Sequence, residues 1–71
     1  MFKNKNVLVT GGSGMIGRQL VKLLQKESAN VCVADLNEPI NMSGITFKKV
    51  DLTNYISCLE ACHGMDYVFN L

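Results

Sequence analysis

The sequence predicts an α/β fold, a parallel doubly wound sheet of about four strands with helices on its faces. Two short runs, residues 7–9 and 31–34, are apolar without alternation, as strands covered on both faces are. Between them, residues 14–27 form an amphipathic run long enough for a crossover helix. A turn with four glycines within residues 11–17 joins the first strand to this helix. This succession predicts one right-handed βαβ unit.

Length and composition bound the class of protein. The chain has 71 residues, 48% of them hydrophobic and 18% charged, which predicts one small globular domain. A formal net charge of +1 gives no basic surface for nucleic acid, and we expect no nucleic-acid partner. No apolar run is long enough for a membrane span, and the N-terminus does not resemble a signal peptide. The 3 cysteines do not suggest a disulfide framework, so we expect reduced thiols and a cytoplasmic protein without a membrane partner.

The first three elements can be bounded from the sequence. The first strand is expected over residues 6–10 and the helix over about residues 14–27. After the helix, Asn30 is expected to adopt the left-handed conformation. The second strand covers residues 31–34 and ends at Asp35. We expect four residues on the apolar side of the helix: Ile16, Leu20, Leu23 and Leu24.

The second half of the chain alternates in the same way. Residues 36–44 are rich in Asn, Pro, Ser and Gly and predict a loop, and residues 45–50 predict a more polar strand nearer the sheet edge. Thr53 is the expected N-cap of a helix over roughly residues 54–63, and Gly64 has the place of a C′ glycine. A fourth strand begins at Tyr67. The apolar face of the second helix is expected to contain Ile56, Leu59 and Cys62.

The glycine turn has the chemistry of an anion site. It fits G-x-G-x-x-G with Gly12, Gly14 and Gly17, and G-x-x-G-x-x-G with Gly11 in place of Gly12. Glycines let the backbone approach a ligand closely. The first turn of the following helix presents unpaired N–H groups and a partial positive charge, which suits a pyrophosphate.

An acidic residue completes the pattern. Asp35 ends the second strand, 21 residues beyond Gly14, close to the spacing of about 20 seen in dinucleotide-binding folds. A carboxylate there accepts hydrogen bonds from both ribose hydroxyls and repels a 2′-phosphate, so NAD is favoured over NADP. A turn that only packs helix against strand would not explain why the glycines and Asp35 converge at the ends of adjacent strands.

Two rival motifs fail on inspection. A P-loop requires Lys and Ser or Thr after its last glycine, where this chain has Arg18 and Gln19. A nucleophile elbow requires glycine where this chain has Met15. Ser13 is therefore expected to be a turn residue whose hydroxyl or N–H faces the phosphates. The intact glycine spacing also disfavours a methyltransferase-like nucleoside binder.

The glycine segment, residues 10–17, resembles the T-G-x-x-G-x-x-G opening of the short-chain dehydrogenase/reductase superfamily. Further details resemble its extended branch, the NAD-dependent sugar-nucleotide epimerases and dehydratases. Residues 33–37 end a strand with no full helix before the next one. Residues 50–53 resemble the family's x-D-[LIV]-[TR] segment, and residues 66–71 resemble the start of its D-x-V-[FI]-[HN]-L-A-A strand. The resemblance covers essentially the whole chain.

The resemblance implies a Rossmann-type cofactor domain and a role for each residue of the turn. Gly11 and Gly14 would make the turn. The N–H groups of Met15 and Ile16 would meet the pyrophosphate. Gly17 would let the helix lie close to the strand.

It also implies how the adenosine is held. Asp35 would bind the ribose, with Asn37 a weaker candidate nearby. Asp51 would accept a hydrogen bond from the adenine amino group, and Leu52 would pack on the ring. Leu71 would line the cofactor cleft. Without the resemblance, Asp51 is as well explained as a solvated acid at a helix entry.

The family's catalytic Tyr-x-x-x-Lys is not expected within these residues, because Tyr55 is followed four residues later by Leu59 and Tyr67 by Leu71. The sequence is therefore predicted to be the N-terminal part, residues 1–71, of a dinucleotide-binding domain. The rest of that domain, the nucleotide-sugar site and the contacts of a homodimer would lie further along a longer chain. The alternative is a non-catalytic Rossmann protein that holds or senses a dinucleotide.

Two remaining expectations concern thiols and stability. Cys58 and Cys62 share a helix face near His63 and could meet a metal, but no fourth ligand is evident, so we expect packed or half-exposed thiols and no metal. Cys32 is expected to be a buried strand residue. The 71 residues in isolation are expected to associate or fold poorly, because the fourth strand would leave an uncovered sheet edge.

Overall fold

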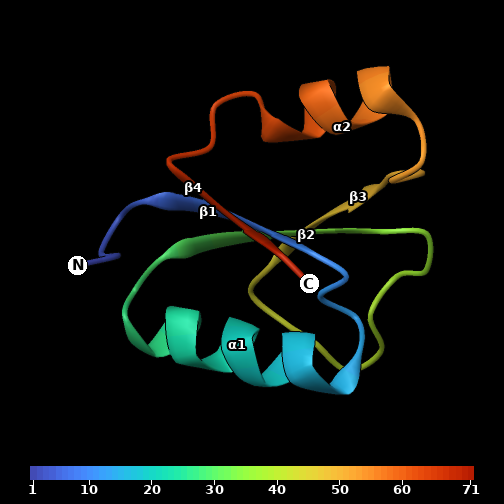
Figure 1. Cartoon of the computed structure of the whole chain (residues 1–71). Helices are drawn as coiled ribbons and strands as arrows, with labels where there is room; N and C mark the ends of the chain where they lie inside the picture. Colours follow the sequence, from blue (N-terminus) through green and yellow to red (C-terminus); the bar gives the residue numbers. More distant parts are fainter.

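The computed structural model describes all 71 residues and has three layers, with the sheet between two helices (Figure 1). Six elements alternate in the predicted order: β1 (Asn6–Thr10), α1 (Met15–Lys26), β2 (Asn30–Asp35), β3 (Thr46–Lys49), α2 (Tyr55–Cys62) and β4 (Tyr67–Asn70). Helices α1 and α2 lie on opposite faces of the sheet. The predicted α/β class and the bounds of the strands are confirmed to within one or two residues.

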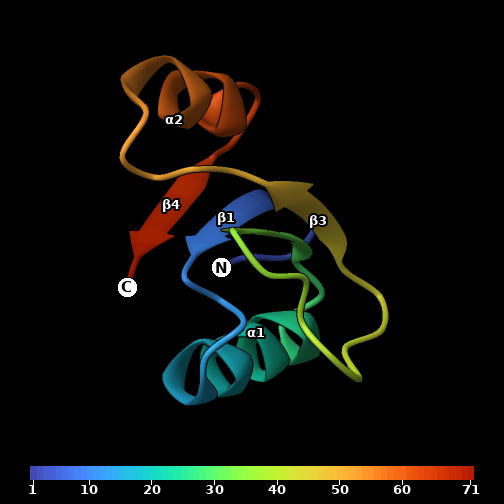
Figure 2. The ribbon, with the colours of Figure 1, turned by 90° about the vertical axis from the view of Figure 1, so that its right-hand side faces the viewer.

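All four strands are parallel, in the order β3-β2-β1-β4. Figure 2 shows β4 and β3 on opposite sides of β1. Leu8 of β1 lies between Cys32 of β2 and Val68 of β4. The chain first steps outward from β1 to β3 and then crosses back to place β4 on the other side of β1. This reversal makes the sheet doubly wound, and in such sheets ligands bind where the strand order reverses, outside the carboxyl ends of the strands.

Strands β1 and β2 are buried on both faces, as their uninterrupted apolar sequence predicts. The face toward α1 is built from Val7, Val9, Val31 and Val33 with Val21 and Leu24 of the helix. The opposite face is built from Leu8, Cys32 and Ala34 with Val50 and with Ala61 of α2. The outer strands β3 and β4 have no fully buried residue.

The prediction of which residues form the apolar side of α1 was partly wrong. Ile16 and Leu23 are 76% and 60% exposed, whereas Gly17, Val21 and Leu24 are buried. At 100° per residue these three positions lie within about 60° of one another, and Ile16 and Leu23 lie on the flank of that stripe. The sequence could not show which part of a wide apolar arc would face the sheet.

The predictions for α2 need two corrections. Its N-cap is Asn54, whose side-chain oxygen accepts from Ser57 N at 3.0 Å, while the Thr53 hydroxyl donates to Asp51 at 2.6 Å. Its buried residue is Ala61. The residues expected to form its apolar face are exposed, Ile56 by 65%, Leu59 by 54% and Cys62 also. Gly64 follows the helix with φ +77°, as predicted for a C′ glycine.

Helix α1 ends in a left-handed residue that is not the predicted one. Ser28 has φ +61°, and Asn30 is instead the first residue of β2. The N–H of Ser28 donates to Gln25 O at 3.0 Å and that of Ala29 donates to Leu24 O at 3.1 Å. This pair of bonds is a Schellman motif, which satisfies two of the last carbonyls of the helix.

The segment after β2 is a loop without a helix, as predicted. The guanidinium of Arg18, in the first turn of α1, donates to the backbone oxygen of Ile40 in this loop, from Nη1 at 2.6 Å and also from Nη2. The amide of Gln25 donates to Ser43 O at 2.8 Å. Two side chains of α1 thus hold the loop against the helix.

Candidate cofactor site

The glycine turn leaves β1 beside the end of β2. Gly11 has φ +72°, a left-handed conformation that glycine adopts without strain. Its N–H donates to Ala34 O at 3.0 Å, so the first residue of the turn is still bonded to the neighbouring strand. The N–H of Gly14 donates back to Gly11 O at 3.4 Å and closes the turn.

Gly17 is required by the contact between α1 and this turn. A Cβ added at Gly17 would lie 2.5 Å from Gly12 Cα and 2.7 Å from Gly11 O. A Cβ at Gly12 would in turn lie 3.0 Å from Val33 Cγ1 and 3.2 Å from Val9 Cγ1. The backbone of α1 therefore rests directly on the turn.

Gly14 is different, because nothing in the chain occupies the space beside it. It is the N-cap of α1 with φ −77°, which any residue can adopt. A Cβ there would meet only Gly11 O, at 3.8 Å. No side chain caps this end of α1, and no acidic residue lies in its first turn. The N–H groups of Met15 and Ile16 therefore face open space with the positive end of the helix dipole behind them.

Asp35 lies next to this turn and is bonded to it. The hydroxyl of Ser13 donates to Asp35 Oδ2 at 2.5 Å, across 22 residues of sequence. Asp35 Oδ1 accepts from the N–H groups of Leu36 at 2.7 Å and Asn37 at 3.5 Å. The Ser13 bond, with smaller help from these backbone donors, lowers the pKa of Asp35 against the opposing effect of burial.

Asp51 and Leu52 follow β3 at the same edge of the sheet. Asp35 pairs with Lys49, so Asp51 lies two residues beyond that register position. Its Oδ1 accepts from Thr53 Oγ1 at 2.6 Å and from Thr53 N at 2.9 Å, and these bonds lower the pKa of Asp51. Its Oδ2 has no partner within the chain.

Leu52 borders an apolar hollow of about 210 Å³ between α2 and the ends of β1 and β4. Thr10, which precedes the glycine turn, lines the same hollow. Leu52 is 40% exposed there.

The thiols of α2 reach the same hollow. Cys58 and Cys62 line it, and the Cys58 thiol donates to Leu52 O at 3.3 Å. The structure contains no group of three or more His, Cys, Asp or Glu side chains arranged to hold a metal ion.

The structure thus gathers the predicted site residues at the carboxyl ends of the strands. The eight main candidates, Gly11, Gly14, Met15, Ile16, Gly17, Asp35, Asp51 and Leu52, all lie at this edge. Leu71 lies beside Gly11, with Leu71 Cβ at 3.6 Å from a Cβ built there. Ser13 was expected to face the phosphates with its hydroxyl or its N–H; the hydroxyl is directed at Asp35 instead, and the N–H stays a prediction. No spacing rule predicted that bond, since it joins a turn to the end of another strand.

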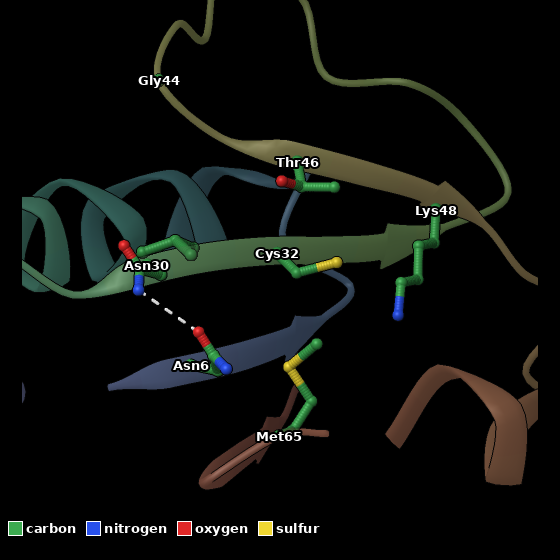
Figure 3. Close-up of a pocket in the computed structure, with 8 residues that line it drawn as sticks. Asn6, Asn30, Cys32, Gly44, Thr46, Lys48 and Met65 are labelled. Atoms are coloured by element: carbon green, nitrogen blue, oxygen red, sulfur yellow. Dashed lines mark hydrogen bonds between the residues drawn. The ribbon is translucent and has the colours of Figure 1, made fainter. Parts of the chain in front are cut away.

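Another hollow, of about 200 Å³, lies toward the opposite end of the strands (Figure 3). Three of its polar side chains already take part in hydrogen bonds: Asn30 Nδ2 donates to Asn6 Oδ1 at 3.2 Å, and Lys48 Nζ donates to Ala61 O at 3.4 Å. Cys32 points into it, and burial raises the pKa of this thiol despite the nearby charge of Lys48. This hollow contains none of the predicted cofactor residues.

A doubly wound parallel sheet with a glycine turn after its first strand and an acid after its second is the arrangement of Rossmann-type dinucleotide-binding proteins. Comparison with known proteins identifies the family. The model of the NAD dependent epimerase/dehydratase family matches residues 7–71. The chain belongs to this family, and the resemblance found in the sequence is confirmed.

Individual relatives agree with this assignment. UDP-glucose 4-epimerase of Rickettsia felis is 29% identical over 83 residues, which cover 99% of this chain and 24% of that protein. Pen from Bacillus thuringiensis is 29% identical with a TM-score of 0.89, covering 100% of this chain and 26% of its own. The enzyme WbmF of Bordetella bronchiseptica, solved in complex with NAD+, is 31% identical with a TM-score of 0.75, covering 99% and 23%. The chain spans about a quarter of the length of these relatives.

Proposed function

We propose that this chain is the NAD-binding portion of an NAD-dependent sugar-nucleotide epimerase or dehydratase. Residues 1–71 would form the N-terminal part of its dinucleotide-binding domain. Membership of the family supports the cofactor, and NAD+ bound in WbmF supports it further. The name of the Rickettsia felis relative supports a nucleotide sugar as the substrate.

The observation that carries the proposal is the free space beside Gly14. The conformation of Gly14 does not require glycine, and no neighbouring atom of the chain does either. A side chain there would fill the space in front of the uncapped end of α1. The absence of a Cβ is explained if a pyrophosphate approaches the backbone closely and accepts from the N–H groups of Met15 and Ile16.

The two acids fit the adenosine half of the cofactor. Asp35 is hydrogen-bonded to the turn itself, so its carboxylate lies where it could meet the ribose next to a pyrophosphate bound there. The Asp35 carboxylate can accept hydrogen bonds from the ribose hydroxyls, whereas it would repel a 2′-phosphate. This difference favours NAD over NADP. Asp51 Oδ2 is free to accept from the adenine amino group, with Leu52 beside it to pack on the ring.

The chemistry of the whole protein would depend on residues beyond these. NAD supplies a hydride acceptor for a sugar carbon, and in this class of reaction the hydride is often returned. In this chain Tyr55 and Tyr67 are not followed by lysine four residues later, so we assign the segment cofactor recognition and no complete catalytic apparatus. The complete protein would work in the cytoplasm as a homodimer. No helix of the structure is long and apolar enough to cross a membrane.

The test measures cofactor binding by the complete protein and by its Gly14→Ala variant. Calorimetry should show binding of NAD and ADP-ribose and weaker binding of NADP. We expect Gly14→Ala to lower the affinity for NAD by about tenfold or more, because the methyl group intrudes where the pyrophosphate lies. Its thermal midpoint should change little, since the Cβ meets no neighbour closer than 3.8 Å.

Gln19→Ala is the matched control, because Gln19 is an exposed residue of α1 one turn further along the helix. It should bind NAD as the parent protein does. Unchanged NAD binding by Gly14→Ala would contradict the proposed position of the pyrophosphate. Absence of NAD binding in the parent protein would contradict the function itself.

A further inference from the structure

The bond between Ser13 and Asp35 points to a role that is separate from the glycines. Ser13 lies in the turn and Asp35 at the end of β2, and both are partly buried. Their side chains meet at 2.5 Å. Asp35 Oδ1 is held by backbone N–H groups of its own segment, so Ser13 is the one donor that reaches the carboxylate from another element. We propose that Ser13 is a positioning residue that orients Asp35 toward the cofactor ribose and thereby sets the preference for NAD over NADP.

The number of acceptor positions on Asp35 fits this role. An ionised carboxylate offers about two lone-pair sites on each oxygen. The Ser13 hydroxyl uses one site on Oδ2, and the N–H of Leu36 uses one on Oδ1 at 2.7 Å. The N–H of Asn37 approaches the second site on Oδ1 at the long distance of 3.5 Å. Oδ2 therefore retains a free acceptor site, and the second site on Oδ1 is only weakly occupied, while the two hydroxyls of a ribose diol offer two donors. Held at both oxygens, the carboxylate is preorganised to accept one hydroxyl on each.

The same bond explains why the Ser13 hydroxyl is not expected to bind the phosphates itself. A serine hydroxyl has a single proton to donate. That proton is directed at Asp35 Oδ2, so it is not available to a pyrophosphate at the end of α1. Ser13 therefore acts through Asp35, and its removal should affect the ribose more than the phosphates.

The consequence for specificity follows from what NAD and NADP share. Both cofactors have the pyrophosphate, but only NAD has a free 2′-hydroxyl that can donate a hydrogen bond to a fixed carboxylate. Without the Ser13 hydroxyl, the Asp35 side chain can rotate, and the affinity for NAD should therefore fall more than the affinity for NADP does. A hydrogen bond to a charged group is strong enough for a loss of about tenfold in NAD affinity.

The experiment is a double-mutant cycle in the complete protein, with NAD and NADP affinities measured by calorimetry at constant salt. The variants are Ser13→Ala, Asp35→Ala, the double variant, and Ser13→Thr, which keeps a hydroxyl. We expect Ser13→Ala to lower NAD affinity about tenfold and to narrow the NAD-to-NADP ratio. In Ser13→Thr the ratio of NAD affinity to NADP affinity should be close to that of the parent protein, because the hydroxyl is retained. In the Asp35→Ala background, Ser13→Ala should change neither affinity further.

A second measurement needs no cofactor. Titration of the Asp35 carboxyl by NMR should give a higher pKa in Ser13→Ala than in the parent protein, and a parent-like pKa in Ser13→Thr. An unchanged pKa would show that the hydroxyl does not engage the carboxylate and would overturn the inference. A role confined to shaping the turn would lower the thermal midpoint without moving this pKa.

The outcomes separate this inference from the proposed function on which it rests. If Asp35→Ala weakens NAD binding but Ser13→Ala leaves the ratio unchanged, the inference is overturned and the function stands. If Ser13→Ala weakens NAD binding equally in the parent protein and in the Asp35→Ala variant, Ser13 contacts the cofactor directly and does not act through Asp35. If the parent protein does not bind NAD, or Asp35→Ala has no effect on it, the cofactor assignment fails and the inference fails with it.

Discussion

Gly17 and Gly12 approach each other so closely that a Cβ on Gly17 would lie 2.5 Å from Gly12 Cα. The three atoms nearest to that Cβ are all backbone, so the clash cannot be relieved by moving the end of a flexible side chain. We expect Gly17→Ala to displace α1 from the turn and to lower the free energy of unfolding by about 2 kcal/mol or more. Chemical denaturation of the ligand-free complete protein measures this.

Gly14→Ala is the comparison for this prediction, because it adds the same methyl group at the other end of the same turn. The space at Gly14 is open, so its unfolding free energy should fall by about 1 kcal/mol or less. Equal destabilisation by the two substitutions would contradict the distinction between a glycine that the fold requires and one that the ligand requires.

Thr10 ties the end of β1 to the end of β4. Its hydroxyl donates to Asn70 Oδ1 at 2.6 Å, and Thr10 is only 7% exposed. Thr10→Val keeps the shape and removes the hydrogen bond, which should lower the free energy of unfolding by about 1 kcal/mol. Hydrogen exchange at the N–H of Leu71, which donates to Thr10 O at 3.2 Å, should become faster because this part of the edge loosens.

Thr10→Ser is the control for the hydroxyl, since it keeps the donor and loses only a methyl group. Protection of the Leu71 N–H should be closer to the parent protein in Thr10→Ser than in Thr10→Val. The opposite order would show that packing of the methyl group, and not the bond to Asn70, holds the two strands together.

The charge of Asp35 gives the proposed binding a predictable dependence on pH. The Ser13 hydroxyl, above all, keeps the pKa of Asp35 below its ordinary value of 3.8. A group whose pKa is lowered on folding stabilises the folded protein above its unfolded pKa, and this stabilisation is lost as the pH falls through the folded value. The carboxylate therefore remains charged between about pH 7 and pH 5, and its contribution to NAD affinity should be constant there.

Calorimetry on the complete protein and on Asp35→Asn isolates this contribution. Asparagine cannot change its charge, so the ratio of the two NAD affinities should stay constant from about pH 7 to about pH 5. A ratio that falls across this range would show that Asp35 becomes protonated there, and that its hydrogen bonds are weaker than the geometry indicates.

The fold could be predicted because its signals are local and agree with one another. Unbroken apolar runs mark the two buried strands, and the glycine spacing marks the turn between β1 and α1. The positions of Gly11, Gly17 and Asp35 followed from that frame, since the carboxyl ends of parallel strands meet at one edge.

The errors in the apolar faces of α1 and α2 have a common cause. An apolar residue on a helix shows a preference for burial, but tertiary packing decides which part of the arc meets the sheet. Ile16 and Leu59 have the right character and lie outside the buried stripe, while the small Gly17 and Ala61 lie within it. Close approach of a helix to a sheet selects small residues, and hydrophobic periodicity gives them little weight.

The bond between Ser13 and Asp35 could not be predicted for a related reason. It depends on the direction in which a tight turn aims one hydroxyl, 22 residues away from its partner. Spacing rules describe each motif by itself, and contacts between motifs need coordinates.

The choice of cap at α2 can also be tested. Asn54 caps the helix by accepting from Ser57 N, whereas the adjacent Thr53 bonds the exposed carboxylate of Asp51. Asn54→Ala should lower the free energy of unfolding by about 1 kcal/mol, and Thr53→Ala should lower it by less. Denaturant unfolding of both variants measures the two losses of unfolding free energy. A larger loss for Thr53→Ala than for Asn54→Ala would indicate that Thr53 is the N-cap.

The left-handed residue after α1 offers a way to stabilise the protein. Ser28 is exposed, its side chain makes no hydrogen bond, and its φ of +61° is unfavourable for a residue with a Cβ. Ser28→Gly relieves that strain and keeps both backbone bonds of the Schellman motif. The relief of about 1–2 kcal/mol exceeds the extra chain entropy of glycine, so we expect a net gain of about 0.5–1 kcal/mol.

Asn30→Gly, two residues further on, is the control with the opposite sign. Asn30 begins β2, lies outside the left-handed region, and donates to Asn6 Oδ1 at 3.2 Å. Glycine there loses the bond and loosens the strand, so the free energy of unfolding should fall by about 0.5–1 kcal/mol. Thermal and denaturant unfolding of the complete protein should therefore rank Ser28→Gly above the parent and Asn30→Gly below it. The reverse ranking would place the left-handed residue at Asn30, because only at a left-handed position does removal of the Cβ stabilise the chain.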